Sequence, residues 1–276
     1  MIDSNQLRKE YISLEVNGVQ LRIASMHREG RRPPLVFLHG FGSTKEDYAD
    51  VACYPQFKDR RIIAFDAPGC GETECADLSS LSIPFLRQAA ERVLEHHGVE
   101  RFHLVGHSMG GLTALMLASG AGRSIVSFTN FKGNLAPEDC FLSRQILDYP
   151  SDDPNAFMKE FVGRTWRDNT FSSPLYAAAL PYKVRAEAIA PIFGSMVDLS
   201  DNDELLEIFT GLPCTKMFVY GEQYRSLSYL GTLMRRGVQL AEIGHSGHFP
   251  MYSNPPVLWA RLSQFIDRSE MEFSHE

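Results

Sequence analysis

The chain has 276 residues, which suits one large α/β domain or one such domain carrying an inserted segment. Its formal net charge is −7 at pH 7, and hydrophobic residues make up 44% of the sequence. Nucleic acid and anionic membranes require a basic protein face, so this charge argues against both as partners. The hydrophobic share is ordinary for a globular protein and suffices for a sizeable core.

No stretch of the sequence resembles an export signal or a membrane span. Residues 1–11 contain no apolar core of a secretory signal, and no apolar run approaches the length that crosses a bilayer. The cysteines are odd in number and form no CxxC pair, which favours free thiols in a reducing compartment. We therefore expect a cytoplasmic protein. The five cysteines are Cys53, Cys70, Cys75, Cys140 and Cys214.

The chain opens with a predicted β-hairpin. Two β-like runs cover residues Glu10–Val16 and Val19–Met26. The Asn17-Gly18 pair between them suits a type I′ turn, because both central residues of that turn need a positive φ.

Short apolar runs then alternate with helical spacing. Residues Phe85–His97 carry apolar side chains on one side and end at Gly98, a helix breaker. The unbroken apolar runs predict strands that are buried on both faces. This alternation indicates a parallel sheet with helices on both faces. The predicted strands are Leu35–Leu38, Arg61–Phe65 and Phe102–Val105.

The second half interrupts this rhythm. A helix of small residues is predicted from Ser108 to about Ser119, and a strand over Ile125–Asn130. Residues 134–211 show helical stretches rich in aromatics and no clear strand, which is too long for a simple crossover. We interpret them as an inserted helical lid on a core of residues 1–133 and 212–276. The core resumes with predicted strands at Lys216–Tyr220 and Val238–Ile243 and a helix from about Pro256 to Ile266.

The strongest motif is Gly106-His107-Ser108-Met109-Gly110, which follows a buried strand and precedes a helix. This is the context of a nucleophile elbow, where a serine stands on a sharp strand-to-helix turn. The flanking glycines avoid clashes in the turn, and the helix points its free N–H groups at the reacting centre. Ser108 is therefore the candidate nucleophile.

A second glycine motif, His39-Gly40-Phe41-Gly42, directly follows the strand at residues 35–38. The chain resembles the α/β-hydrolase superfamily in four motifs. These are this glycine motif, the elbow, residues 66–71 (Asp-Ala-Pro-Gly-Cys-Gly) and residues 247–250 (Gly-His-Phe-Pro). The resemblance covers nearly the whole chain except the lid. It implies a mostly parallel eight-stranded sheet with helices on both faces. It also implies an oxyanion hole formed by the backbone N–H groups of Phe41 and Met109.

The base that activates Ser108 must come from a loop at the same edge of the sheet. The loop after the strand Val238–Ile243 meets this condition and holds two histidines, His245 and His248. The family pattern places the base in a Gly-His-Phe-Pro setting before the terminal helix. This selects His248 and leaves His245 as a capping or solvent-exposed residue.

The third member of a catalytic triad, an acid, is not found in register. The family places it three residues after a glycine that follows the seventh strand, where this chain has Tyr224. The other usual position lies at the end of the sixth strand, and here it aligns with Lys132. We expect Lys132 at a position where relatives carry a carboxylate, with a solvated loop lysine as the rival interpretation. Three nearby carboxylates are candidate substitutes: Glu222, Glu138 and Asp139.

These patterns predict a serine hydrolase that cleaves a carboxylic ester, including lactones or thioesters, through an acyl-enzyme. Its partner would be a small ester-type molecule. Hydrolysis of a carbon–carbon or amide bond on the same fold is one alternative, and a catalytically weakened ligand-binding protein is another. The sequence contains no metal-binding cluster and no dinucleotide fingerprint, so we expect no cofactor and no metal. It does not determine the oligomeric state.

Overall fold

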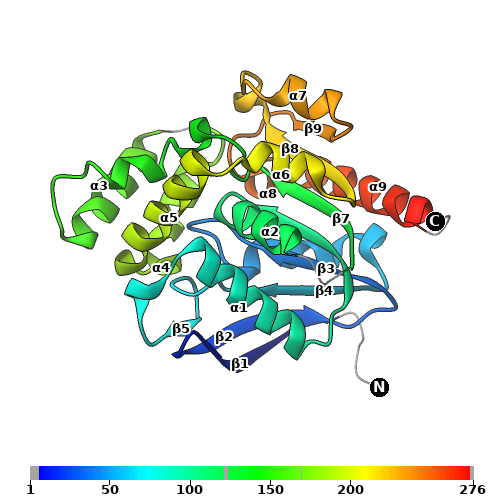
Figure 1. Ribbon diagram of the computed structural model, residues 1–276, viewed down its shortest axis with the longest axis horizontal. Coiled ribbons are helices and arrows are strands. Elements are labelled where there is room, and N and C mark those ends of the chain that lie inside the picture. The colour runs from blue at the N-terminus through cyan, green and yellow to red at the C-terminus, as the bar shows by residue number, and fades with distance from the viewer. Residues whose placement is uncertain (1–5, 121–123, 169, 274–276) are drawn as a thin grey trace.

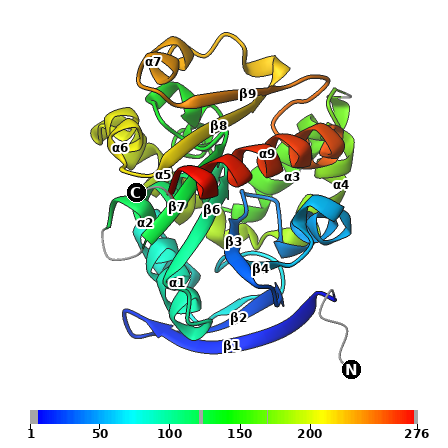
Figure 2. The same cartoon turned by 90° about the vertical axis from the view of Figure 1, so that its right-hand side faces the viewer.

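The computed structural model describes residues 6–120, 124–168 and 170–273. One twisted sheet runs through the molecule, with helices packed on both of its faces (Figure 1). Helix α9 crosses the face opposite helices α1 and α2 (Figure 2). Helices α3, α4 and α5 group together at one side of the molecule (Figure 1).

The sheet begins with an antiparallel hairpin of β1 (Arg8–Val16) and β2 (Val19–Arg28). Asn17 has a φ of 50° and Gly18 a φ of 82°, so both turn residues adopt the left-handed conformation that the sequence predicts. The predicted hairpin is confirmed.

Eight strands form the main path of the sheet, in the order β1-β2-β4-β3-β6-β7-β8-β9, and β5 pairs with β2. From β4 to β9 neighbouring strands are parallel, which confirms the predicted mostly parallel eight-stranded sheet. The remaining strands are β3 (Arg32–Leu38), β4 (Arg60–Phe65), β5 (Glu74–Cys75), β6 (Arg101–His107), β7 (Ser124–Phe131), β8 (Thr215–Gly221) and β9 (Gln239–Ile243).

Three of the core helices lie close to their predicted positions, and two short ones, at residues 230–235 and 250–253, were not predicted. Helix α9 runs on to residue 273, beyond the predicted end near Ile266, because its polar last turns are held by ion pairs. Asp267 and Glu270 bind the buried guanidinium of Arg60, with N–O distances of 3.0 and 2.7 Å. Such residues carry no apolar period and so gave no helical signal. The core helices are α1 (Ile83–His96), α2 (Met109–Ser119), α7 (Leu230–Arg235), α8 (Pro250–Ser253) and α9 (Pro255–Phe273).

Four further helices connect β7 to β8, within the range where a lid is predicted. They are accompanied by short 3-10 turns, among them Pro137–Cys140. The four helices are α3 (Pro154–Arg167), α4 (Ser173–Lys183), α5 (Ile189–Asn202) and α6 (Leu205–Gly211).

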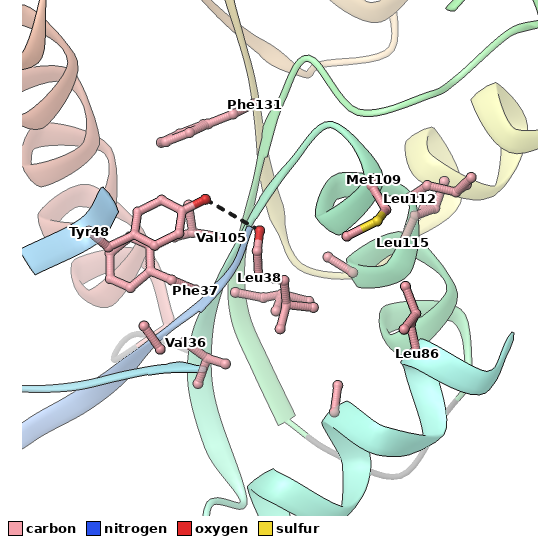
Figure 3. Close-up of a cluster of buried hydrophobic side chains, with 14 of the residues drawn as sticks. Val36, Phe37, Leu38, Tyr48, Leu86, Val105, Met109, Leu112, Leu115 and Phe131 are labelled. Carbon is pink, nitrogen blue, oxygen red and sulfur yellow. Dashed lines mark hydrogen bonds between the residues drawn. The ribbon is translucent and has the colours of Figure 1, made fainter. Parts of the chain in front are cut away.

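The central strand β3 is covered on both faces, which explains its unbroken apolar run. Met109, Leu112 and Leu115 of α2 and Leu86 of α1 pack on one side of it (Figure 3). Tyr48 packs on the other side, where its ring stacks on Phe37 at a centroid distance of 4.7 Å and its hydroxyl approaches the Leu38 carbonyl (Figure 3).

A buried ion pair joins the loops that follow β3 and β4. The Lys45 ammonium lies 2.8 Å from Oδ2 of Asp66, and the two side chains are 1% and 0% exposed. The same carboxylate accepts the backbone N–H groups of Lys45 and Glu72 at 2.8 and 2.9 Å. A Cβ at Gly71 would lie 2.2 Å from Oδ2, so only glycine fits there. The pair therefore fixes the loop that contains His39-Gly40-Phe41.

Replacing Asp66 by alanine should lower the free energy of unfolding by about 3–5 kcal/mol, because it leaves the Lys45 ammonium buried beside one acceptor fewer. Urea denaturation followed by circular dichroism measures this change. Glu74→Ala is the control, since its bond to Arg22 is exposed and should contribute less than about 1 kcal/mol. Similar losses in the two variants would contradict a structural role for the buried pair.

Candidate active site

The turn between β6 and α2 holds Ser108 with φ 51° and ψ −119°. Residues with a Cβ rarely adopt a positive φ unless the surrounding structure enforces it. The Ser108 N–H donates to the carbonyl of Phe131 at 2.9 Å, which ties the turn to the end of β7. A Cβ at Gly106 would lie 2.5 Å from the Gly110 carbonyl oxygen, and a Cβ at Gly110 2.2 Å from that of Leu38. Both glycines are therefore steric requirements of the turn.

The Ser108 side chain is half-buried, and helix α2 begins at the next residue, Met109. The backbone carbonyl of Ser108 accepts the N–H groups of Gly111 and Leu112 at 2.8 and 3.0 Å. The Met109 N–H belongs to the first turn of the helix, so the helix ladder does not use it. It remains a donor for a group that reacts with Ser108.

The loop after β3 passes directly over the nucleophile. A Cβ at Gly40 would lie 2.6 Å from Nδ1 of His107 and 3.0 Å from Cβ of Ser108. The His39 ring fixes this loop: its Nε2 accepts the Ala67 N–H at 2.8 Å, so its Nδ1 carries the proton and donates to the Gly40 carbonyl at 2.8 Å. The Phe41 amide, next in the chain, follows this fixed segment.

Side chains from α4 and α5 press on the same loop. Gly42 has a φ of 75°, and a Cβ there would lie 2.3 Å from Cε2 of Tyr176. The Tyr176 hydroxyl donates to the Phe41 carbonyl at 3.2 Å. The Phe41 ring packs on Phe193, with ring centroids 4.5 Å apart. The predicted oxyanion loop is thus held by the core on one side and by the predicted lid on the other.

His248 stands in the loop after β9, just before α8. Its ring centroid lies 5.0 Å from that of His107, the residue before the nucleophile. Nε2 of His107 donates to the His248 carbonyl at 2.8 Å, which fixes the backbone of the base. Nδ1 of His248 lies 3.1 Å from the hydroxyl oxygen of Tyr224. His245 is exposed, and its N–H donates to Glu222 at 2.9 Å.

Burial keeps both adjacent imidazoles neutral. It lowers the pKa of His107 to about 4. The pKa of His248 lies well below its usual 6.5, first because of burial and then because a positive charge on His248 would be repelled by one on His107 or Lys132. A neutral imidazole can accept a proton, so His248 is available as a base at pH 7.

Lys132 directly follows β7 and has a φ of 46°, and only 6% of its surface is exposed. Its ammonium forms an ion pair with Asp139 and lies 4.9 Å from the centroid of the Tyr224 ring. The interpretation of Lys132 as a solvated loop residue is therefore wrong. The chain places a buried cation close to the base.

The three candidate substitute carboxylates have other partners. Asp139 is bound by Lys132 and by the Tyr229 hydroxyl, the latter at 2.9 Å. Glu138 accepts the Ser228 N–H and hydroxyl at 3.1 and 2.7 Å, and Glu222 accepts the His245 N–H. Within the described ranges, the side chain hydrogen-bonded to Nδ1 of His248 is Tyr224. The sequence aligned Tyr224 with the usual position of the acid but did not indicate this contact.

The described residues contain neither a metal-binding group nor a helix that could span a membrane. No group of three or more histidine, cysteine or acidic side chains there is arranged to hold a metal ion. No helix in residues 6–120, 124–168 and 170–273 combines the length and apolarity of a bilayer span.

Known proteins similar to this chain include a dihydrolipoyllysine-residue acetyltransferase component of the acetoin cleaving system from Pseudomonas putida. It is 35% identical over 116 residues, which are 42% of this chain and 30% of that protein. The pimeloyl-(acyl-carrier protein) methyl ester esterase of Aeromonas hydrophila is 31% identical over 121 residues, 44% of each protein. The chain thus spans less than half the length of these two relatives.

Among solved structures, a thermophilic esterase from Thermogutta terrifontis aligns with a TM-score of 0.73 and 17% identity, over 95% of this chain and 99% of that one. At this identity the likeness shows the fold alone. The model of the alpha/beta hydrolase family matches residues 35–262, most of the chain. The chain belongs to the alpha/beta hydrolase family.

Proposed function

We propose that this protein hydrolyses carboxylic esters through an acyl-enzyme formed on Ser108. The observation that carries the proposal is the left-handed backbone of Ser108 at the start of α2, enforced by close-packed glycines. Such a turn costs about 1–3 kcal/mol and persists where it presents a reactive side chain. The similarity to a methyl ester esterase supports ester cleavage.

In the proposed reaction, Nε2 of His248 takes the proton of Ser108 as its oxygen attacks the substrate carbonyl. The amides of Phe41 and Met109 donate to the oxyanion that forms, and each such donor typically contributes two to three powers of ten in rate. The imidazolium then gives its proton to the leaving alcohol. Water attacks the acyl-enzyme with His248 again as base, which releases the acid and restores Ser108.

The rings beside the oxyanion loop suggest the kind of substrate. Phe41 contacts Phe193, and Tyr176 lies with its ring centroid 4.2 Å from that of Phe249, the residue after the base. Phe161 lies with its centroid 6.5 Å from that of Phe41. These rings belong to α3, α4, α5 and the loop of the base. An apolar or aromatic acyl or alcohol group would gain more from them than a charged one.

A fluorophosphonate probe should label the protein once, at Ser108. Ser108→Ala should abolish labelling and lower ester turnover by roughly four to six powers of ten, because the covalent route is lost. Mass spectrometry of the labelled peptide and a p-nitrophenyl ester assay measure the two effects. Ser119→Ala, at the exposed end of α2, is the control and should change neither. Labelling at another serine, or a protein that binds esters without turnover, would refute the proposal.

Lengthening the acyl chain of a p-nitrophenyl ester from acetyl to hexanoyl should raise kcat/KM by roughly fourfold for each methylene that is buried, equivalent to about 0.8 kcal/mol. Succinyl and other charged acyl groups should be poor substrates. Phe193→Ala should flatten the dependence on chain length, because it removes a ring that packs on the loop after β3, and Leu175→Ala, an exposed residue of α4, should not. A preference for short charged esters would contradict this substrate assignment.

A further inference from the structure

Nδ1 of His248, the ring nitrogen that in a serine triad faces a carboxylate, here faces a phenol. The oxygen of Tyr224 lies 3.1 Å from it. Tyr224 ends the turn Glu222–Tyr224, which directly follows β8, and its ring meets the imidazole edge-on with centroids 5.9 Å apart. Burial raises the pKa of this phenol to about 12, so it stays neutral across the working range of an enzyme.

The nearest buried carboxylate cannot replace the phenol. The Asp139 side chain is fully buried, and its Oδ1 contacts the Lys132 ammonium and the hydroxyl of Tyr229. Its Oδ2 accepts the N–H groups of Leu135 and Ala136 at 2.8 and 3.0 Å. Turning Asp139 toward His248 would break all four contacts and leave Lys132 as a buried, unpaired cation, which is strongly unfavourable.

Lys132 cannot replace the phenol either, because an ammonium has three donors and no acceptor. Nδ1 carries a proton in the tautomer that leaves Nε2 free to accept the proton of Ser108. That proton needs an acceptor, and a phenol oxygen supplies one.

We propose that Tyr224 is the positioning residue of the active site, and that its phenol oxygen accepts the Nδ1 proton of His248 in place of a carboxylate. The inference rests on the proposed function. A phenol aligns the imidazole but brings no negative charge to stabilise the imidazolium. The nearby Lys132 cation further disfavours the positive charge of the imidazolium, so His248 is a weak base and remains unprotonated down to low pH.

Tyr224→Phe keeps the ring and removes the acceptor. It should lower kcat for a p-nitrophenyl ester by roughly 10- to 100-fold with little change in KM, because the phenol does not touch the substrate. The matched control is Tyr220→Phe, four residues earlier, whose ring packs near Phe218. It should retain normal kcat. Equal kinetics for Tyr224→Phe and the native protein would overturn the inference.

Nitrogen-15 NMR of His248 gives a readout independent of turnover. The native protein should show a protonated Nδ1 and a bare Nε2, and Tyr224→Phe should show a mixture of tautomers. A native His248 protonated on Nε2 would overturn the inference. If the native protein shows the expected tautomer and yet Ser108 does not react with the fluorophosphonate, the proposed function fails while the hydrogen bond from His248 to Tyr224 stands.

The double variant Lys132→Met/Asp139→Asn removes both charges together and so avoids leaving one of them unpaired. The groups that face His248 are then Tyr224, from the turn after β8, and His107, from β6. Loss of the cation should raise the pKa of His248, so the acid limb of kcat/KM should move to higher pH. Tyr224→Phe in this background should still lower kcat. An unmoved limb together with no effect of Tyr224→Phe would refute the arrangement proposed here.

Discussion

The left-handed turn at Ser108 is the constraint on which the rest of the site depends. Its amide is tied to β7 through the Phe131 carbonyl, and the two glycines around it allow β3 and α2 to approach within contact distance. A side chain at Gly110 would push α2 off the end of β3, where the oxyanion loop begins. The positions of Ser108, of the predicted oxyanion loop and of the strands around them therefore depend on the same packing.

The parallel strands then bring distant residues to one edge. The loops after β3, β4, β6, β7, β8 and β9 all leave the sheet at the same end, so residues far apart in sequence meet there. His39 links the loops after β3 and β4, and His107 links the end of β6 to the loop after β9. Neutral imidazoles suit this task, because they bring no charge into the core. His39 donates at one nitrogen and accepts at the other, and His107 donates through Nε2.

Much of this arrangement could be predicted from local pattern. Asn17-Gly18 can form few other turns, the apolar runs require buried strands, and the elbow glycines leave one place for the nucleophile. The hydrogen-bond partner of His248 could not be predicted from local pattern. Register placed Tyr224 at the usual acid position, but only the packed loops show that its hydroxyl reaches Nδ1 while Asp139 is bound to Lys132. Which side chain completes a hydrogen bond between two loops is decided by tertiary packing, and a sequence pattern carries no signal for it. The short elements β5, α7 and α8 were missed because two to six residues show no clear period.

Helix α4 is attached at both ends to loops that follow core strands. Tyr176 donates to the carbonyl of Phe41 in the predicted oxyanion loop. The far end of the helix is bound to the loop after β4, through the carbonyl of Lys183 and the amide of Gly71 at 2.9 Å. Movement of this helix away from the core would break the hydrogen bond between Tyr176 and the Phe41 carbonyl. The position of α4 and the conformation of the loop after β3 are therefore coupled, so that a displacement of one requires a change in the other.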